Sequence, residues 1–123
     1  MAVSGDREAL PTIGFWPQIK AVDEWLDAGV ADHFKDQPLA QDWARVAKIA
    51  EEAGEAIAEL ILSTGQNPRK PLDSEAGARM LHEMADVALT AILGIQHFTK
   101  DVGATRRIVE RRMERIWGRA TNV

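Results

Sequence analysis

Apolar residues recur along most of the chain at the three- and four-residue spacing of amphipathic helices, and no segment shows the sustained two-residue alternation of a strand. The pattern predicts four helices, over residues 16–33, 39–63, 74–99 and 102–118. Residues 1–14 are expected to form a loose N-terminal segment. The prediction is therefore an all-α four-helix bundle, built by a single domain over residues 1–123.

Local signals mark where these helices begin and end. Pro17 suits the first turn of a helix, where its missing N–H costs nothing. Asp73 or Ser74 is expected to cap the third helix, and Asp101 the fourth. Gly118 is expected to end the fourth helix.

The charged residues of the second predicted helix gather on one side. At about 100° per residue, Glu51, Glu52, Glu55, Glu59 and Lys48 all fall within one quarter of the helical wheel. A solvated face usually mixes glutamate with lysine at a spacing of four residues, whereas this face is mostly of one sign. Glu59 is a further candidate acid at the edge of the group.

The third predicted helix carries two isolated carboxylates. Between Met80 and Thr99, only Glu83 and Asp86 are formally charged, and Thr90 continues their face. A helix that is apolar almost all round is usually buried, so both carboxylates are expected to be buried or to face a cavity.

Converging carboxylates need a compensating charge. Two like charges about 4 Å apart repel by roughly 4 kcal/mol at an effective dielectric near 20. Protonation, arginine side chains and divalent cations each relieve that repulsion, and a spacing of three residues lets two carboxylates reach one ion. Alone, the cluster at residues 51–55 is better explained as a solvated surface, and Glu83 with Asp86 is equally well explained by core salt bridges. Their occurrence on consecutive helices favours a divalent-metal site.

Composition and charge narrow the class of protein. The chain is 46% hydrophobic and 28% charged, which is typical of a soluble globular protein. It has no cysteine, so disulfides and zinc-thiolate sites are excluded, and a reducing, cytoplasmic location is expected. No membrane span or signal segment is predicted. The net charge of −4 disfavours nucleic-acid binding, although six arginines lie within residues 106–119.

The two acidic clusters match a family signature. The stretches EEAGE at residues 51–55 and EMAD at residues 83–86 fit the pattern E-E-x-x-E followed by E-x-x-D. From about Gln18 to Arg115 the chain resembles the MazG-like, all-α nucleoside triphosphate pyrophosphohydrolases. The resemblance implies hydrolysis of a nucleoside or deoxynucleoside triphosphate to a monophosphate and pyrophosphate, supported by Mg²⁺ or Mn²⁺.

The resemblance also implies roles for individual residues. It implies that the metal is bound by Glu52, Glu55, Glu83 and Asp86. Glu51 would be an outer ligand or orient the attacking water.

Basic residues are expected to meet the phosphates. Lys48 is expected to stabilise the charge of the reacting phosphates. Arg69 and Lys70 of the predicted loop and Arg112 of the last helix are either solvated charges or further phosphate contacts. Family members often carry a Lys-x-x-x-Asn pattern on the last helix, and this chain has arginines instead. The preferred base therefore stays open.

The sequence also bears on two other classes of protein. A di-iron or di-manganese carboxylate bundle needs Glu-x-x-His pairs, and Ala58 and Asp86 stand where its histidines would be. His82 and His97 are interpreted as core or interface residues. A helical module that binds a partner without catalysis stays open. Because the third helix is too apolar for a monomer, a homodimer is expected, and the resemblance also allows a homotetramer.

Overall fold

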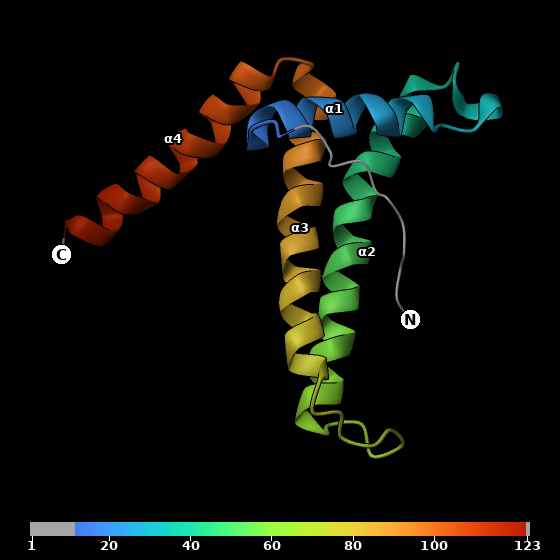
Figure 1. Ribbon diagram of the computed structural model, residues 1–123, viewed down its shortest axis with the longest axis vertical. Coiled ribbons are helices and arrows are strands. Elements are labelled where there is room, and N and C mark those ends of the chain that lie inside the picture. The colour runs from blue at the N-terminus through green and yellow to red at the C-terminus, as the bar shows by residue number, and fades with distance from the viewer. Residues whose placement is uncertain (1–11, 123) are drawn as a thin grey trace.

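Helices make up most of the part of the chain that the structure describes, which is residues 12–122 of a computed structural model (Figure 1). The elements are α1 (Phe15–Ala28), the 3₁₀ turn η1 (Asp32–Phe34), α2 (Pro38–Thr64), α3 (Ala76–Thr99) and α4 (Val102–Thr121). No strand occurs within residues 12–122, so the all-α prediction is confirmed. The expected loose segment lies mostly outside the described residues, and residues 12–14 precede α1 without helical structure.

The ends of α2 and the start of α4 follow local chemistry. Pro38 occupies the first turn of α2, and Gly65 ends that helix with φ of 68°, a left-handed conformation that glycine adopts without a Cβ clash. The Asp101 carboxylate accepts a hydrogen bond of 3.1 Å from the backbone N–H three residues later, which confirms the predicted cap.

Other boundaries differ from the prediction. The first helix ends at Ala28 rather than near residue 33, and the 3₁₀ turn follows it. The prediction that Asp73 or Ser74 caps the third helix is wrong, because α3 begins two residues later than expected and Glu75 stands at its N-cap without a side-chain cap bond. The Asp73 carboxylate instead accepts a hydrogen bond from the Glu75 N–H at 2.9 Å, just ahead of α3. The prediction that Gly118 ends the last helix is wrong, because α4 continues through it. One glycine inside an exposed helix costs only about 1 kcal/mol.

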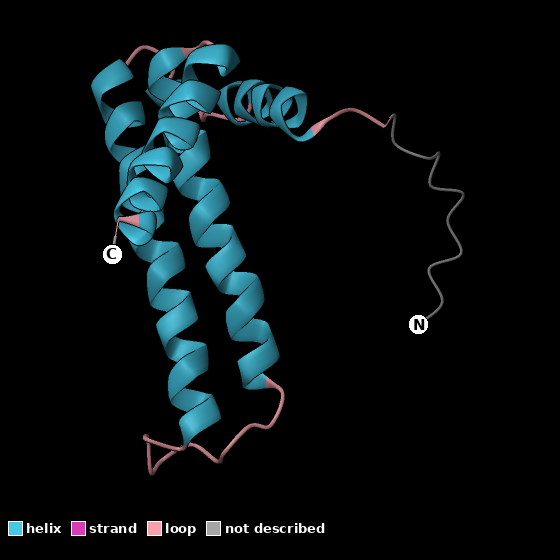
Figure 2. Ribbon diagram, turned by 90° about the vertical axis from the view of Figure 1, so that its left-hand side faces the viewer, coloured by secondary structure: helices cyan, strands magenta, loops and turns pink. Residues whose placement is uncertain are grey.

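The helices do not close into a bundle within one chain. α2 and α3 form a long antiparallel hairpin, and α1 crosses the open end of that hairpin (Figures 1 and 2). α4 leaves the end of α3 and diverges from the hairpin as an arm. The structure therefore shows four α-helices compatible with a bundle, while a single copy leaves large helix faces uncovered.

The hydrophobic core of the single chain is small. Among the described residues, the buried apolar side chains are Ile19, Ala56 and Ala76. Many large apolar side chains are exposed instead, including those of Leu39, Trp43, Ile57, Leu81, Met84, Phe98, Met113, Ile116 and Trp117. The expectation that the third helix is buried all round is therefore wrong for one isolated chain.

Candidate metal centre and adjoining cavity

Three carboxylates converge between α2 and α3. Oxygens of Glu52, Glu55 and Glu83 all lie within 4.8 Å of one another. Glu52 and Glu55 stand on adjacent turns of α2, and Glu83 faces them from α3. The antiparallel packing of the hairpin thus brings together acids that are about thirty residues apart in sequence.

Within this group, Glu83 has a carboxylate oxygen without a compensating partner. Its Oε2 is buried and accepts no hydrogen bond from any described residue. A buried polar atom without a partner costs about 1–3 kcal/mol, and more when it is charged. Carboxylate oxygens are the ligands that Mg²⁺ prefers, and Mg²⁺ commonly takes one or two carboxylates with water and phosphate oxygens. The residues present therefore fit a divalent cation.

Asp86 and Glu51 stand apart from the three converging acids. Asp86 is exposed and does not belong to the group, so the expectation that both acids of the third helix are buried is wrong for Asp86. Three residues turn a helix by about 300°, which places Asp86 about 60° away from Glu83 around α3. Glu51 is also exposed and does not belong to the group.

Lys48 bridges the acids of α2. Its Nζ lies 3.1 Å from Oε2 of Glu51 and 3.5 Å from Oε1 of Glu52. The hydrogen bond with Glu51 is the main reason that the pKa of Lys48 is raised above its ordinary value, so the ammonium stays charged at neutral pH. The structure thus places Lys48 beside the metal-site candidates.

The other predicted substrate contacts do not reach the acids within one chain. Arg69 and Lys70 are exposed in the loop at the closed end of the hairpin, beyond the end of α2. Arg112 is exposed on α4, the arm that diverges from the hairpin (Figure 1).

Glu59 has a structural partner and is not an extra acid of the group. The Arg79 Nε donates to Oε2 of Glu59 at 3.0 Å, and Nη2 of the same arginine donates to Oδ2 of Asp73 at 2.6 Å. The hydrogen bond from Arg79 is the main cause that lowers the pKa of Asp73. These contacts tie the loop to the hairpin.

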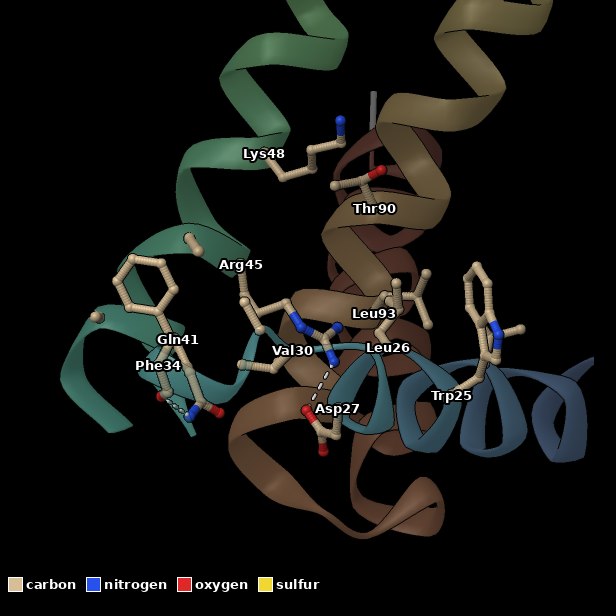
Figure 3. A pocket seen from close by; sticks show the side chains of 14 residues that line it. Trp25, Leu26, Asp27, Val30, Phe34, Gln41, Arg45, Lys48, Thr90 and Leu93 are labelled. Atoms are coloured by element: carbon tan, nitrogen blue, oxygen red, sulfur yellow. Dashed lines mark hydrogen bonds and ion pairs between the residues drawn. The ribbon is translucent and has the colours of Figure 1, made fainter. Parts of the chain in front are cut away.

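A cavity of about 560 Å³ lies between α1, the start of α2 and α3 (Figure 3). Its lining is mostly apolar and includes Trp25, Leu26, Val30, Phe34 and Leu93. At one end of the cavity, Lys48 and Thr90 lie across from each other on α2 and α3. Glu52, Glu55 and Glu83 do not line the cavity, but Lys48 does, and its Nζ lies 3.5 Å from Oε1 of Glu52, so Lys48 links the cavity to the metal-site candidates.

A network of charged side chains holds α1 over the end of the hairpin. Nη2 of Arg45 donates to Oδ1 of Asp23 at 2.9 Å and to Oδ1 of Asp27 at 3.1 Å. Nζ of Lys100 donates to the second oxygens of the same two acids, at 2.8 and 2.6 Å. The Asp23 side chain is 3% exposed, so this ion pair is buried. Figure 3 shows Arg45 reaching across the cavity wall to Asp27.

The network shifts the pKa of two of its members. Burial by itself would raise the pKa of Asp27, but the hydrogen bonds from Lys100 and Arg45 outweigh it and hold that pKa below its ordinary value. Burial would likewise lower the pKa of Lys100, while the hydrogen bonds to Asp23 and Asp27 raise it above the ordinary value. The two acids are therefore matched by two cations, unlike Glu83.

His97 joins the edge of this network. Its Nε2 lies 2.6 Å from Oδ1 of Asp42, and its Nδ1 is buried without a hydrogen bond, 3.8 Å from Oδ1 of Asp27. Its side chain is 8% exposed, as expected for a core histidine. His82, by contrast, is exposed on the single chain.

Sequence reasoning missed the cavity and this network. Two features of the sequence could have indicated the network. Asp23 and Asp27 lie one turn apart on an amphipathic helix, and Arg45 lies near the start of the next helix. Which acid meets which cation depends on how α1 crosses the hairpin, and the helical period does not specify that crossing.

Comparisons with known proteins give no match, whether with family models, with curated proteins or with solved structures. Among the described helices, none combines the length and the apolar character that crossing a membrane requires.

Proposed function

We propose that the protein hydrolyses nucleoside or deoxynucleoside triphosphates to the monophosphate and pyrophosphate, with Mg²⁺ or Mn²⁺ as cofactor. One observation carries the proposal: Lys48, which lines an apolar cavity, contacts a group of carboxylates that includes an unpartnered buried oxygen. The cavity volume falls within the roughly 300–1,000 Å³ of small-molecule sites. The signature EEAGE and EMAD supplies the substrate class.

The cavity and the carboxylate group would bind different parts of the substrate. The apolar lining suits a nucleoside, with Trp25 and Phe34 as aromatic surfaces. The triphosphate would extend past Lys48 and Thr90 towards Glu52, Glu55 and Glu83. Because acids repel phosphates, this pose requires a cation between them, and the three acids are the residues that would hold it. When bound, a divalent ion offsets the phosphate charge and activates water for attack.

The reaction adds water across the α–β phosphoanhydride. The water oxygen forms a bond to the α-phosphorus, and the bond from that phosphorus to the bridging oxygen breaks. The bridging oxygen keeps the electron pair and leaves as part of pyrophosphate. Glu51, a carboxylate outside the converging group, orients the water and accepts its proton.

Lys48 and the cavity wall contribute without changing covalently. The Lys48 ammonium, held by Glu51 and Glu52, stabilises the negative charge that spreads over the phosphoryl oxygens during the reaction. The apolar lining keeps bulk water from the nucleoside end of the substrate. Asp86 becomes a fourth ligand only if its side chain turns towards Glu83.

The large exposed apolar faces support a second part of the proposal, that the protein is at least a homodimer. The same faces favour the competing function, a helical module that binds a partner without catalysis. That alternative gives no role to the unpartnered Glu83 oxygen or to the cavity. It predicts that neither nucleotide nor Mg²⁺ affects the protein.

A nucleotide panel tests the proposed activity. The purified chain is incubated with each ribo- and deoxyribonucleoside triphosphate and Mg²⁺, and pyrophosphate and orthophosphate are scored separately. We expect pyrophosphate with at least one substrate, and no activity in chelator. Glu52→Gln and Glu83→Gln should abolish the release, while Glu24→Gln, an exposed carboxylate on α1, should leave it unchanged. Release of orthophosphate alone, or of neither product, would overturn the proposal.

A further inference from the structure

We propose that Gln41 selects the base of the nucleotide and favours an amino group over an oxo group on the base edge that it contacts. Cytosine and adenine carry such an amino group, whereas uracil, thymine and guanine carry an oxygen at the corresponding position. This inference rests on the proposed function, because it takes the cavity to be the site that holds the nucleoside.

Gln41 lines the cavity at a distance from Lys48 and Thr90, which lie at its other end (Figure 3). It precedes Lys48 on α2 by seven residues, which is nearly two full turns and about 10 Å of helix. One side of α2 presents Gln41 first, Lys48 next, and then the acids Glu52 and Glu55, all within about 60° on the helical wheel. A nucleotide whose phosphates lie between Lys48 and the acids therefore directs its base towards Gln41.

Two backbone carbonyls fix the orientation of the Gln41 amide. Its Nε2 donates to the Phe34 carbonyl at 2.6 Å and to the Lys35 carbonyl at 3.3 Å. The reverse orientation would set the amide oxygen against two carbonyl oxygens, neither of which can donate. Within residues 12–122, no group donates a hydrogen bond to Oε1 of Gln41. The amide therefore offers the cavity an acceptor and keeps its donor for the η1 turn.

Asp27, the acid in the cavity wall, is already paired. Its two oxygens accept hydrogen bonds from Arg45 at 3.1 Å and from Lys100 at 2.6 Å. Apolar side chains surround Gln41 in the wall, including that of Phe34. A polar ligand atom placed among them loses its hydrogen bonds to water, and Oε1 of Gln41 is an unpaired acceptor that can replace one of them. A base therefore fits best when it places a donor there.

The edge of each base determines what it can place at Gln41. In a pyrimidine, the 4-position lies directly across the ring from the nitrogen that bears the sugar, so its substituent reaches furthest from the phosphates. Cytosine carries a 4-amino group, which donates to Oε1 of Gln41, whereas the 4-oxygen of uracil or thymine meets Oε1 as a second acceptor. Adenine and guanine differ in the same way at the 6-position. A site with a buried polar group discriminates strongly against an analogue that leaves this group unpaired.

Hydrolysis of dCTP and dUTP measures the preference. With Mg²⁺, we expect kcat/KM for dCTP to exceed that for dUTP at least about tenfold, which is the effect of one good hydrogen bond. Gln41→Met keeps the length of the side chain but removes the acceptor, so the ratio should fall to about one. Gln41→Lys can still donate to the two carbonyls but has no acceptor, so dUTP should become the better substrate. A wild type that hydrolyses dUTP as well as dCTP, or a wild-type ratio in Gln41→Met, overturns the proposal.

Gln37 provides a matched control for the structural role of the amide. Its Nε2 donates to the His33 carbonyl at 3.0 Å, so it holds the same turn as Gln41 does, but its side chain is exposed and does not line the cavity. Gln37→Met should keep the wild-type ratio of dCTP to dUTP hydrolysis. If Gln37→Met lowers this ratio as much as Gln41→Met does, both amides act only by holding the turn, and the proposal is wrong.

Binding of the monophosphates dCMP and dUMP separates this proposal from the proposed function, because binding needs no hydrolysis. In calorimetry with Mg²⁺, the dissociation constant of dCMP should be at least about tenfold lower than that of dUMP, and Gln41→Met should remove the difference. If the protein releases no pyrophosphate but shows this difference, the proposed function fails and the role of Gln41 stands. If it releases pyrophosphate but binds both monophosphates equally, the proposed function stands and the role of Gln41 fails.

Discussion

Nη2 of Arg45 lies 2.9 Å from Oδ1 of Asp23, and this pair joins α1 to α2 where both side chains are largely buried. Lys100, at the end of α3, approaches the other Asp23 oxygen at 2.8 Å. Three segments of the chain therefore meet at one carboxylate. The position of α1 over the hairpin, and with it the cavity, depends on this contact.

Arg45→Met should destabilise the protein by about 3 kcal/mol, because removing one partner of a buried pair leaves a charge without compensation. Lys100 remains and limits the loss. Lys20→Met is the control, since Lys20 pairs with Glu24 at 3.1 Å on the surface and should cost less than about 0.5 kcal/mol. The free energy of unfolding in urea measures both. Equal losses would mean that the Asp23 contact does not anchor α1.

Glu83→Gln should stabilise the metal-free protein. Two charges 4.8 Å apart repel by about 3.5 kcal/mol at an effective dielectric of 20 and by about 1 kcal/mol in water, and the exposure of Glu55 favours the lower figure. Thermal unfolding in chelator measures the change. Asp36→Asn makes the same carboxylate-to-amide replacement at an exposed turn and should have no such effect. An unchanged or lower stability of Glu83→Gln would contradict convergence of the acids.

Mg²⁺ should raise the melting temperature of the wild-type chain. A ligand at one hundred times its dissociation constant stabilises the folded state by about 2.7 kcal/mol. The increase should disappear in Glu52→Gln and in Glu83→Gln, and persist in Arg45→Met, whose replaced residue lies outside the acidic group. Sodium chloride at matched ionic strength separates binding from screening. Equal increases in all variants would show that the ion binds elsewhere.

The free energy of unfolding should fall at both extremes of pH, because Asp27 loses its charge in acid and Lys100 loses its charge in alkali. The pKa of Asp27 is below 3.8 in the folded chain, so its contribution is complete above about pH 3.8 and is lost as the pH falls through the folded value. The pKa of Lys100 is above 10.5, so its contribution is complete below that pH and is lost as the pH rises through the folded value.

Variants can separate the two limbs of this pH dependence. Urea unfolding between pH 3 and 11 should show a shallower alkaline decline in Lys100→Met and a shallower acid decline in Asp27→Asn. Lys35→Met, which removes an exposed lysine beside Asp32, should keep the wild-type profile. Profiles that coincide for all variants would exclude this pair as the source.

Filling the cavity should weaken binding of the nucleotide substrate and leave Mg²⁺ binding unchanged. Ala44→Leu adds three carbons to the cavity wall. Accommodating a ligand beside these extra atoms should cost about 1–3 kcal/mol, the usual cost of overpacking. We expect kcat/KM for the best nucleotide to fall at least about tenfold, while stabilisation by Mg²⁺ is unchanged. Ala58→Leu, on α2 away from the cavity, serves as the control. An unaffected kcat/KM would place the nucleoside outside this cavity.

The helical periods and the acid spacing could be read from the chain because both are local. Pro38 and Asp101 act on backbone groups within one turn, so the helix starts that depend on them follow from sequence. The helical period of about 100° per residue is enough to predict that Glu52, Glu55 and Lys48 share one side of the helix. The facing of Glu83 towards them follows once the two helices pack antiparallel.

What lies between helices was decided by the tertiary structure. Asp86 is exposed although its helix is apolar, because packing on α2 selects the side of α3 that bears Glu83. Glu59 is bound by Arg79, which the wheel could not show. The buried Asp23 carboxylate and the cavity exist only because α1 crosses the hairpin at one place. The sequence by itself determined the helices and which carboxylates share a face, because both depend on neighbours along the chain. The crossing of α1 and the divergence of α4 depend on contacts between distant segments, so only the tertiary structure specifies them.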